Sequence, residues 1–297
     1  MNKLVVILGP TASGKSNLAV KLAKFFNGEI ISADSRQVYR GMNIGTGKIT
    51  KKEREGISHH LLDVVSPKTK FTVSQYQKLA NKKIKEIFQR HHLPIVVGGT
   101  GFYLQAIIDG IVIPPVKPNW NLRKKLEKKS VEELYQILKK IDPRRAKTID
   151  KKNPRRLIRA LEIVLTTKKP VPKIQVNPPP YQILILGLKK SKTELKKLIR
   201  ERLIKRLKNG MVEEVKKLKK KGISWKRLEE FGLEYRWLAY YLQNKISYQE
   251  MIEKLQRAIE QYARRQMVWF KRDKRIKWIK NYREAKKLIQ KFLKCNQ

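Results

Sequence analysis

A phosphate-binding loop motif near the amino terminus constrains this chain more than any other feature. Residues 9–16 read GPTASGKS and match the pattern G-x-x-x-x-G-K-[ST] in full. An apolar run precedes the motif over residues 3–8, and residues 14–26 carry leucine and phenylalanine at helical spacing. A buried strand, a glycine-rich turn and a helix in this order form the context that the motif requires. The order predicts an α/β fold that binds a phosphorylated ligand.

Each part of this loop has a physical reason. Glycines let backbone N–H groups turn toward phosphate oxygens, and the amino terminus of the following helix adds the positive end of its dipole. The lysine can bridge phosphates, and the final serine hydroxyl suits Mg²⁺. We therefore expect Ser16 to be a metal ligand. The residues expected to bind a diphosphate or nucleotide are Gly9, Pro10, Thr11, Ala12, Ser13, Gly14, Lys15 and Ser16.

Further apolar runs indicate the rest of the sheet. They lie at residues 29–33, 93–97, 183–188 and 276–279, and a long basic segment with helical spacing covers residues 72–90. Strands that alternate with helices predict right-handed crossovers and a parallel sheet flanked by helices.

Two proline-rich segments interrupt this alternation. Residues 113–118 contain three prolines and residues 170–180 contain five. Proline ends helices and cannot donate to a strand ladder, so such segments mark boundaries. The basic residues between them have helical spacing over 119–129, 131–140 and 154–167. We predict an α/β core of residues 1–113 and 181–297 with a helical insertion domain at 114–180. The alternative is an ordinary run of core helices with proline-capped ends.

The polar residues after the second and third predicted strands bear on the chemistry. The third strand ends in GGTG, with a hydroxyl at Thr100 and no carboxylate, whereas an ATPase or helicase normally has an acidic Mg²⁺ ligand there. A carboxylate, Asp34, follows the second strand instead. Ligands bind at the carboxyl ends of parallel strands, so Asp34 is a candidate general base or Mg²⁺ ligand. A helix amino-terminal cap is the alternative.

The charge balance points to a polyanionic partner. The 297 residues include 70 Lys and Arg against 25 Asp and Glu, a formal charge of +45. Nucleic acid is favoured over an anionic membrane surface, with a general lysine bias as the alternative. A single cysteine, Cys295, excludes a disulfide framework and a cysteine-based zinc site. No apolar run approaches the roughly 18 residues of a membrane span, and an apolar strand starts almost at Met1. We expect a cytoplasmic protein that does not bind membranes and, without an obvious dimer seam, a monomer.

Two basic or aromatic features each allow two interpretations. Arg202 and Arg206 stand at i and i+4 spacing on a predicted helix, either as diphosphate ligands or as part of a solvated basic face. Residues 257–271 interleave aromatic residues with arginines, which fits either base stacking or an amphipathic helix packed on the core.

Six further blocks resemble the tRNA dimethylallyltransferases, also called tRNA isopentenyltransferases, in order along nearly the whole chain. They are DSRQVY at 34–39, GMNIGT at 41–46, HHLLD at 59–63, VGGTGFY at 97–103, NPRRLIRALE at 153–162 and RRQMVWF at 264–270. The resemblance implies a P-loop nucleotide-kinase-like parallel sheet with a helical insertion domain that clamps the tRNA anticodon stem-loop. It implies transfer of a dimethylallyl group from dimethylallyl diphosphate to N6 of the adenosine 3′-adjacent to the anticodon, with Mg²⁺.

By the same resemblance, the residues at 9–16 hold the diphosphate and Asp34 takes a proton from N6. Thr100 acts near the bridging oxygen, and Arg123 is also important for catalysis. A block at 231–236 lines a further RNA contact. The residues implied to contact tRNA are Asp34, Ser35, Arg36, Gln37, Arg155, Arg156, Leu157, Ile158 and Arg159.

The chain also departs from the family pattern. Glu234 stands where many relatives have glycine, and the segment around Trp120 is variable. Many eukaryotic relatives carry a carboxyl-terminal zinc finger. With a single cysteine we expect none here, so the chain resembles the bacterial type. The competing interpretations are a P-loop nucleotide or small-molecule kinase and a non-catalytic, RNA-binding NTPase-like module.

Overall fold

A computed structural model describes residues 2–294, so Cys295 lies outside the described part. The chain divides into two compact units. The first consists of Met1–Gly110 with Pro178–Gln297, and the second of Ile111–Asn177. The second unit thus starts and ends three residues before the predicted insertion, 114–180.

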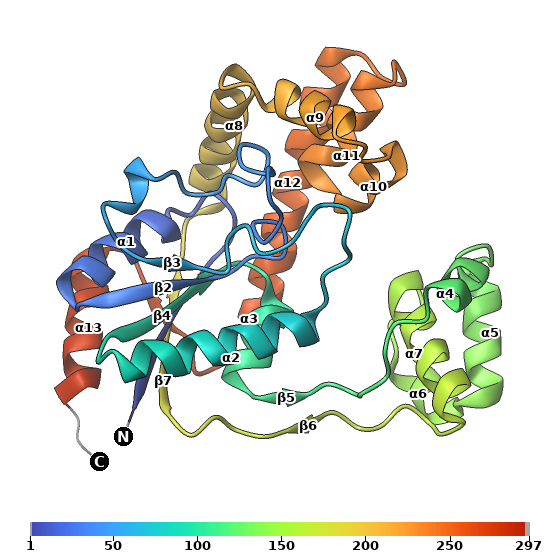
Figure 1. Cartoon of the computed structure of the whole chain (residues 1–297), viewed down its shortest axis with the longest axis horizontal. Helices are drawn as coiled ribbons and strands as arrows, with labels where there is room; N and C mark the ends of the chain where they lie inside the picture. Colours follow the sequence, from blue (N-terminus) through green and yellow to red (C-terminus); the bar gives the residue numbers. More distant parts are fainter. Residues whose placement is uncertain (1, 295–297) are drawn as a thin grey trace. The chain divides into compact units, whose positions relative to one another are not determined.

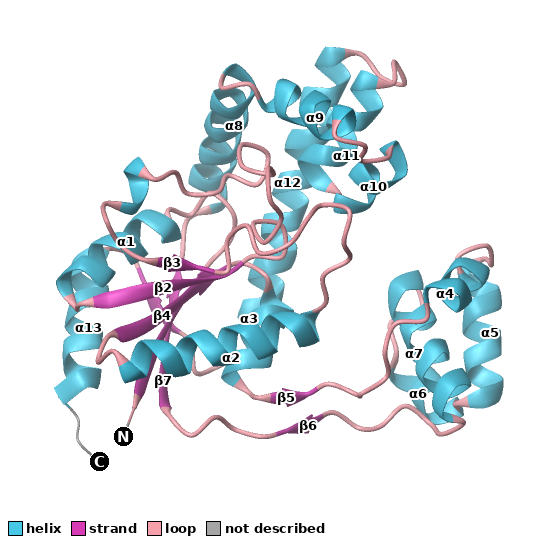
Figure 2. Ribbon diagram, viewed as in Figure 1, coloured by secondary structure: helices cyan, strands magenta, loops and turns pink. Residues whose placement is uncertain are grey.

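A six-stranded parallel sheet forms the centre of the first unit. Its strands are drawn in magenta in Figure 2. The strand order is β3-β2-β4-β1-β7-β8. All five predicted strands are present, so the predicted α/β class with a parallel sheet is confirmed. The sixth strand, β3, was not predicted because it has only two half-buried residues. The strands are β1 (Lys3–Leu8), β2 (Gly28–Ala33), β3 (His59–His60), β4 (Leu93–Gly98), β7 (Gln182–Leu188) and β8 (Lys277–Ile279).

Helices cover both faces of this sheet (Figure 1). The alternation of side chains along β1 shows why: Leu4 and Val6 pack toward α2 and α3, whereas Val5 and Ile7 pack toward α1 and α13. These helices are α1 (Lys15–Phe25), α2 (Val73–Gln89), α3 (Gly101–Ile108) and α13 (Tyr282–Lys294).

The remaining helices of the first unit surround a second hydrophobic core. The loop after β2 contributes Val38, Tyr39 and Met42 to this core, so the helices hold the segment that follows Asp34. Within the segment 257–271, residues 257–270 belong to a long helix that buries Ile259, as the amphipathic interpretation predicts. These helices are α8 (Lys192–Lys208), α9 (Met211–Lys220), α10 (Trp225–Phe231), α11 (Leu233–Leu242) and α12 (Tyr248–Phe270), and a short 3-10 turn lies at Lys52–Arg54.

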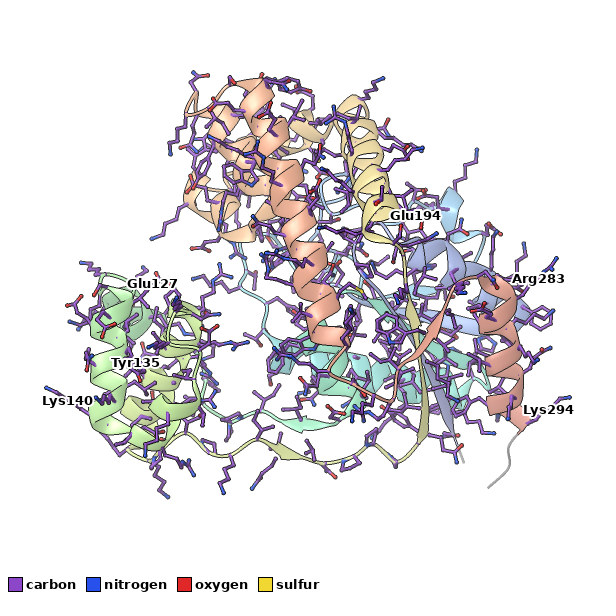
Figure 3. The ribbon with its side chains drawn as sticks, turned by 180° about the vertical axis from the view of Figure 1, so that it is seen from behind. Glu127, Tyr135, Lys140, Glu194, Arg283 and Lys294 are labelled. Carbon is purple, nitrogen blue, oxygen red and sulfur yellow. The ribbon has the colours of Figure 1, made fainter. Side chains whose placement is uncertain are left out.

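The second unit is a small helical bundle with its own core. Leu134, Leu138 and Leu161 pack at its centre, and a capping box at Ser130 begins α5. An antiparallel pair of two-residue strands, not predicted from the sequence, joins the segments that enter and leave the bundle. Outward side chains such as Lys140 are visible in Figure 3. The elements are β5 (Ile111–Val112), α4 (Trp120–Leu126), α5 (Val131–Ile141), α6 (Pro143–Thr148), α7 (Pro154–Thr167) and β6 (Gln175–Val176).

Within residues 2–294, no helix combines the length and the apolar character needed to cross a membrane.

Candidate active site

The predicted site residues of the first unit follow three adjacent strands. Gly98 at the end of β4 is in register with Leu8 of β1 on one side and with Ala33 of β2 on the other. The phosphate-binding loop, Asp34 and Thr100 therefore emerge at the same edge of the sheet. The backbone N–H of Thr100 donates to the carbonyl of Ala33 at 3.2 Å, which ties the second and third of these loops together.

The phosphate-binding loop has the backbone of an anion site. Ala12 and Gly14 have left-handed φ angles of 61° and 87°, and Gly14 begins α1 without a side-chain cap. The buried hydroxyl of Ser13 has no hydrogen-bond partner among the described residues. Unsatisfied N–H and hydroxyl groups at a helix amino terminus favour a bound phosphate.

Lys15 belongs to a group of interacting charges at this loop. Its Nζ donates to the carbonyl of Pro10 at 3.2 Å. Burial, together with repulsion from Arg202, lowers the pKa of Lys15 to about 8, although attraction by Asp34 opposes the shift. A bound diphosphate would compensate for the lost hydration and stabilise the charged lysine.

Asp34 caps a turn and keeps one oxygen available. Its Oδ1 accepts from the backbone N–H groups of Arg36, at 2.8 Å, and Gln37, at 3.4 Å. No helix starts at this turn, so the helix-cap interpretation is wrong and the carboxylate caps a turn instead. Its Oδ2 has no hydrogen-bond partner within residues 2–294, which leaves it free to accept a proton.

Thr100 is joined to the turn that Asp34 caps. Its Oγ1 accepts from the backbone N–H of Ser35 at 3.1 Å. The two loops approach so closely that a Cβ on Gly98 would overlap the carbonyl of Ala33. The catalytic candidates Asp34 and Thr100 thus belong to one hydrogen-bonded assembly.

In the segment 231–236, expected to line an RNA contact, Phe231 supports Arg36. The Nε of Arg36 donates to the carbonyl of Phe231 at 2.7 Å. The side chains of Phe231 and Tyr235 are buried in the core, so they are not accessible to RNA. Gln37, in turn, donates to the carbonyls of Thr46 and Gly47.

Arg202 and Arg206 do not form a solvated basic face. Arg206 is buried and donates to the carbonyl of Gly45 at 2.7 Å and to Glu234 Oε1 at 3.0 Å. Glu234, which stands where many relatives have glycine, thus serves as the counter-charge of Arg206. The ion pair leaves Arg206 less suited to bind a diphosphate. Arg202 donates to the carbonyl of Gly47, and burial, with repulsion from Arg206, lowers the pKa of Arg202 to about 10. Only Arg202 of the two interacts with Lys15, so it remains the candidate diphosphate ligand.

Sequence reasoning missed the role of Glu214. Its carboxylate accepts from the backbone N–H groups of Asn43 and Ile44, both at 2.7 Å, and of Gly45 at 3.0 Å. The hydroxyl of Tyr235 donates to it at 2.8 Å. In the sequence, Glu214 is only an acidic residue at a helical position that the structure shows to be buried. Nothing near it indicates that it binds the loop at residues 43–45. Glu214 thus holds the loop whose carbonyl oxygens accept hydrogen bonds from Gln37 and Arg202.

The second unit contains a buried carboxylate that holds two of its predicted site residues. Glu162 has no exposed surface, and Arg123 donates to both of its oxygens, at 2.8 Å from Nε and 2.6 Å from Nη2. Arg159 also pairs with Glu162. Although burial opposes it, hydrogen bonds from these arginines lower the pKa of Glu162. The Arg123 guanidinium lies 4.9 Å from the ring centroid of Trp120.

The other predicted tRNA contacts of this unit fall on α7. Arg155 and Arg156 are exposed in its first turn, where Asn153 caps the helix. The side chains of Leu157 and Ile158 are buried in the core of the bundle and pack the unit.

The phosphate-binding loop is better suited to hold a metal ion than any other part of the described chain, and the ion that it suits is Mg²⁺. The described part of the chain has no cluster of three His, Cys, Asp or Glu side chains that could hold a metal ion. His60 instead pairs with Glu29, 2.6 Å away. Mg²⁺ at phosphate sites needs only one or two protein oxygens, because the phosphates and water supply the rest. The exposed Ser16 hydroxyl and the free oxygen of Asp34 are suitable donors.

A phosphate-binding loop on a parallel sheet makes this chain a P-loop α/β protein, a class that binds phosphorylated substrates at the carboxyl ends of its strands. Residues 37–273 match the family described as IPP transferase. This match covers more than half of the chain, which therefore belongs to that family.

Curated relatives agree with this assignment. The chain is 46% identical over 286 residues to tRNA dimethylallyltransferase 1 of Syntrophus aciditrophicus, a match that covers 94% of each chain. It is 40% identical over 302 residues to the tRNA dimethylallyltransferase of Pelotomaculum thermopropionicum, covering 99% of this chain and 96% of the relative.

Solved structures show the same fold. The full-length tRNA isopentenylpyrophosphate transferase of Bacillus halodurans has a TM-score of 0.73 and 37% identity, covering 99% of this chain and 96% of the other. A eukaryotic dimethylallyltransferase described as acting on tRNA has a TM-score of 0.76 and 30% identity, covering 91% of this chain and 70% of the other.

Proposed function

We propose that this protein transfers a dimethylallyl group from dimethylallyl diphosphate to N6 of the adenosine 3′-adjacent to the anticodon of tRNA. The observation that carries the proposal is the meeting of the phosphate-binding loop, the free oxygen of Asp34 and the hydroxyl of Thr100 at one edge of the sheet. The names of the curated relatives support the choice of substrates.

The diphosphate would bind to the loop at residues 9–16. Its developing negative charge must be neutralised as the carbon–oxygen bond breaks, and Lys15 and the backbone N–H groups are suited to this. Arg202 would add a second cation. Mg²⁺, held by Ser16 and the diphosphate, would supply further charge neutralisation when bound. Thr100 would donate toward the bridging oxygen of the leaving group.

Asp34 would act as the general base. The N6 nitrogen forms a bond to the allylic carbon while the bond from that carbon to the diphosphate oxygen breaks, and the amine then loses a proton. The free Oδ2 of Asp34 would accept this proton, while Oδ1 keeps the turn in place. A flipped-out adenine that fills the site would also exclude water, which would otherwise capture the allylic carbon.

The tRNA anticodon stem-loop would contact both units. In the first unit, Ser35, Arg36 and Gln37 adjoin Asp34, and in the second, Arg155 and Arg156 expose guanidinium groups. Residues 111–177 carry 19 Lys and Arg against 6 Asp and Glu, which suits phosphate contacts. We propose that Arg123 serves catalysis and Arg159 contacts tRNA while both are held by their ion pairs with Glu162. The protein would act as a monomer in the cytoplasm, where tRNA is modified.

A transfer assay tests this function. The protein is incubated with unmodified tRNA and radiolabelled dimethylallyl diphosphate in Mg²⁺ buffer without ATP. We expect label in the tRNA, at the adenosine next to the anticodon. Consumption of ATP without label in the tRNA would instead indicate the kinase alternative, and RNA binding without either reaction would indicate a non-catalytic module.

A further inference from the structure

Gln266 connects the two glycine-rich loops of the site. Its side-chain Oε1 accepts from the backbone N–H of Thr11 at 2.8 Å, and its Nε2 donates to the carbonyl of Gly99 at 2.8 Å. Thr11 belongs to the phosphate-binding loop after β1, and Gly99 precedes Thr100 after β4. Gln266 itself lies on α12, far away in the sequence, and is 6% exposed. One planar amide therefore spans the two loops.

The chemistry of this bridge requires an amide. The Thr11 backbone needs an acceptor and the Gly99 backbone needs a donor, and a glutamine side chain supplies one of each. Removing either partner leaves a buried polar group without a hydrogen bond, which disfavours the bridged arrangement of the two loops. Because both hydrogen bonds use the same rigid group, the distance between the two loops is fixed by the width of one amide.

The glycines of the second loop accommodate this helix. A Cβ on Gly99 would overlap Nε2 of Gln266, and a Cβ on Gly101 would lie 2.6 Å from the indole of Trp269. Thr100, between these two glycines, is therefore held close to α12. The glycine-rich turn after β4 thus serves the close approach of a helix, whereas the turn after β1 presents N–H groups to phosphate.

We infer that Gln266 is a positioning residue for group transfer. It acts through Thr11 on the diphosphate loop and through Gly99 on the hydroxyl of Thr100, so it sets where the leaving group lies relative to Thr100 and Asp34. This inference rests on the proposed function. Transfer needs the breaking bond and the base aligned, and a displacement of about 1 Å can lower the rate by about 100-fold.

Two substitutions separate the halves of the bridge. Gln266→Met has a similar length and removes both hydrogen bonds. Gln266→Glu keeps an acceptor for Thr11 but turns a carboxylate oxygen toward the carbonyl of Gly99, so the two repel. The matched control is Gln261→Met, an exposed glutamine on the same helix. Gly99→Ala is an independent test, since its methyl group would displace the Gln266 amide.

The measurements are steady-state transfer kinetics, tRNA affinity and melting temperature. We expect Gln266→Met to lower kcat by about 100-fold, with tRNA affinity within about twofold of the parent protein and the control variant unchanged. Gln266→Glu should be impaired similarly although it retains the Thr11 bond. Gly99→Ala and Gln266→Met combined should cost less than the product of their single effects, because both break the same bridge.

Several outcomes would overturn the inference. A folded Gln266→Met protein with kcat within threefold of the parent would do so, and so would loss of tRNA affinity as large as the loss of kcat, which would make Gln266 an RNA contact. If Gln266→Met does not fold, Gly99→Ala decides by the same criteria. If the parent protein itself transfers no dimethylallyl group, the proposed function fails, and calorimetric affinity for inorganic diphosphate then tests the bridge: unchanged affinity in folded variants contradicts it.

Discussion

Arg123 places its Nη2 2.6 Å from Oε2 of Glu162, a carboxylate without exposed surface. The second oxygen of Glu162 accepts from Arg123 Nε at 2.8 Å and from the backbone N–H of Asn119 at 2.7 Å. With Arg159 on the same carboxylate, α4 and α7 are joined through one acidic side chain. An arginine proposed to serve catalysis is thus held rigidly within its own unit.

The first prediction concerns Glu162. Glu162→Gln leaves two partly buried arginines without a counter-charge, so we expect it to lower the free energy of unfolding by about 3 kcal/mol. Urea unfolding at neutral pH measures this, with the exposed Glu127→Gln as control. Since the native pKa of Glu162 is lowered, the stabilisation is present above the pKa of the unfolded state and is lost as pH falls through the native pKa. Equal stability of the two variants would contradict this prediction.

The second prediction separates the two oxygens of Asp34. Asp34→Asn keeps an acceptor for the Arg36 backbone but cannot take a proton, whereas Asp34→Ala loses both functions. We expect Asp34→Asn to lower kcat by at least about 100-fold with tRNA affinity within about threefold of the parent, and Asp34→Ala to lower both. Steady-state transfer kinetics and filter binding measure the two quantities. Near-normal turnover in Asp34→Asn would remove this residue from the mechanism.

The sequence predicted the features that local patterns encode. Apolar runs identified five strands, and the loop motif located the edge where Asp34 and Thr100 meet, because parallel strands end on one side of a sheet. The two-residue strand at His59–His60 was missed, since a half-buried pair has no measurable period. The spacing of apolar residues predicts the helices and strands and their order along the chain. This order was sufficient to predict the fold class.

Contacts between segments far apart in the chain could not be predicted from the sequence. Arg206 and Glu234 each looked ambiguous alone, and only the folded structure shows that Arg206 of α8 and Glu234 of α11 form an ion pair. Leu157 and Ile158 directly follow two exposed arginines in a helix but are themselves buried. The helical period thus divides a contiguous sequence block between core and surface. Gln266 gave no local signal because both of its partners are backbone groups more than 160 residues away.

The third prediction addresses the basic face of α7. If Arg155 and Arg156 contact phosphates, replacing both with serine should weaken tRNA binding and reduce the slope of log affinity against log salt by about 0.7–0.9 per lost contact. Binding is measured from about 50 to 300 mM KCl. The control replaces two exposed lysines of α13, Lys287 and Lys291, with serine. Identical slopes for the two double variants would show that net charge, and not this face, determines binding.

The fourth prediction follows from the lowered pKa of Lys15. In the free protein this pKa is about 8, mainly because burial and Arg202 disfavour the charge. A bound diphosphate stabilises the charged form and raises the pKa, so binding takes up a proton wherever the free lysine is neutral. Affinity should therefore be full below pH 7 and fall as pH rises through 8.

Calorimetry with a thiolo analogue of dimethylallyl diphosphate measures this dependence without turnover. We expect affinity to fall about tenfold between pH 7 and pH 9, with a proton uptake that appears when buffers of different ionisation enthalpy are compared. Lys15→Arg keeps its charge over this range, so its affinity should vary much less, whatever its absolute value. A parent protein whose affinity stays constant to pH 9 would show that Lys15 is already charged in the free site, and that the nearby carboxylate of Asp34 outweighs burial.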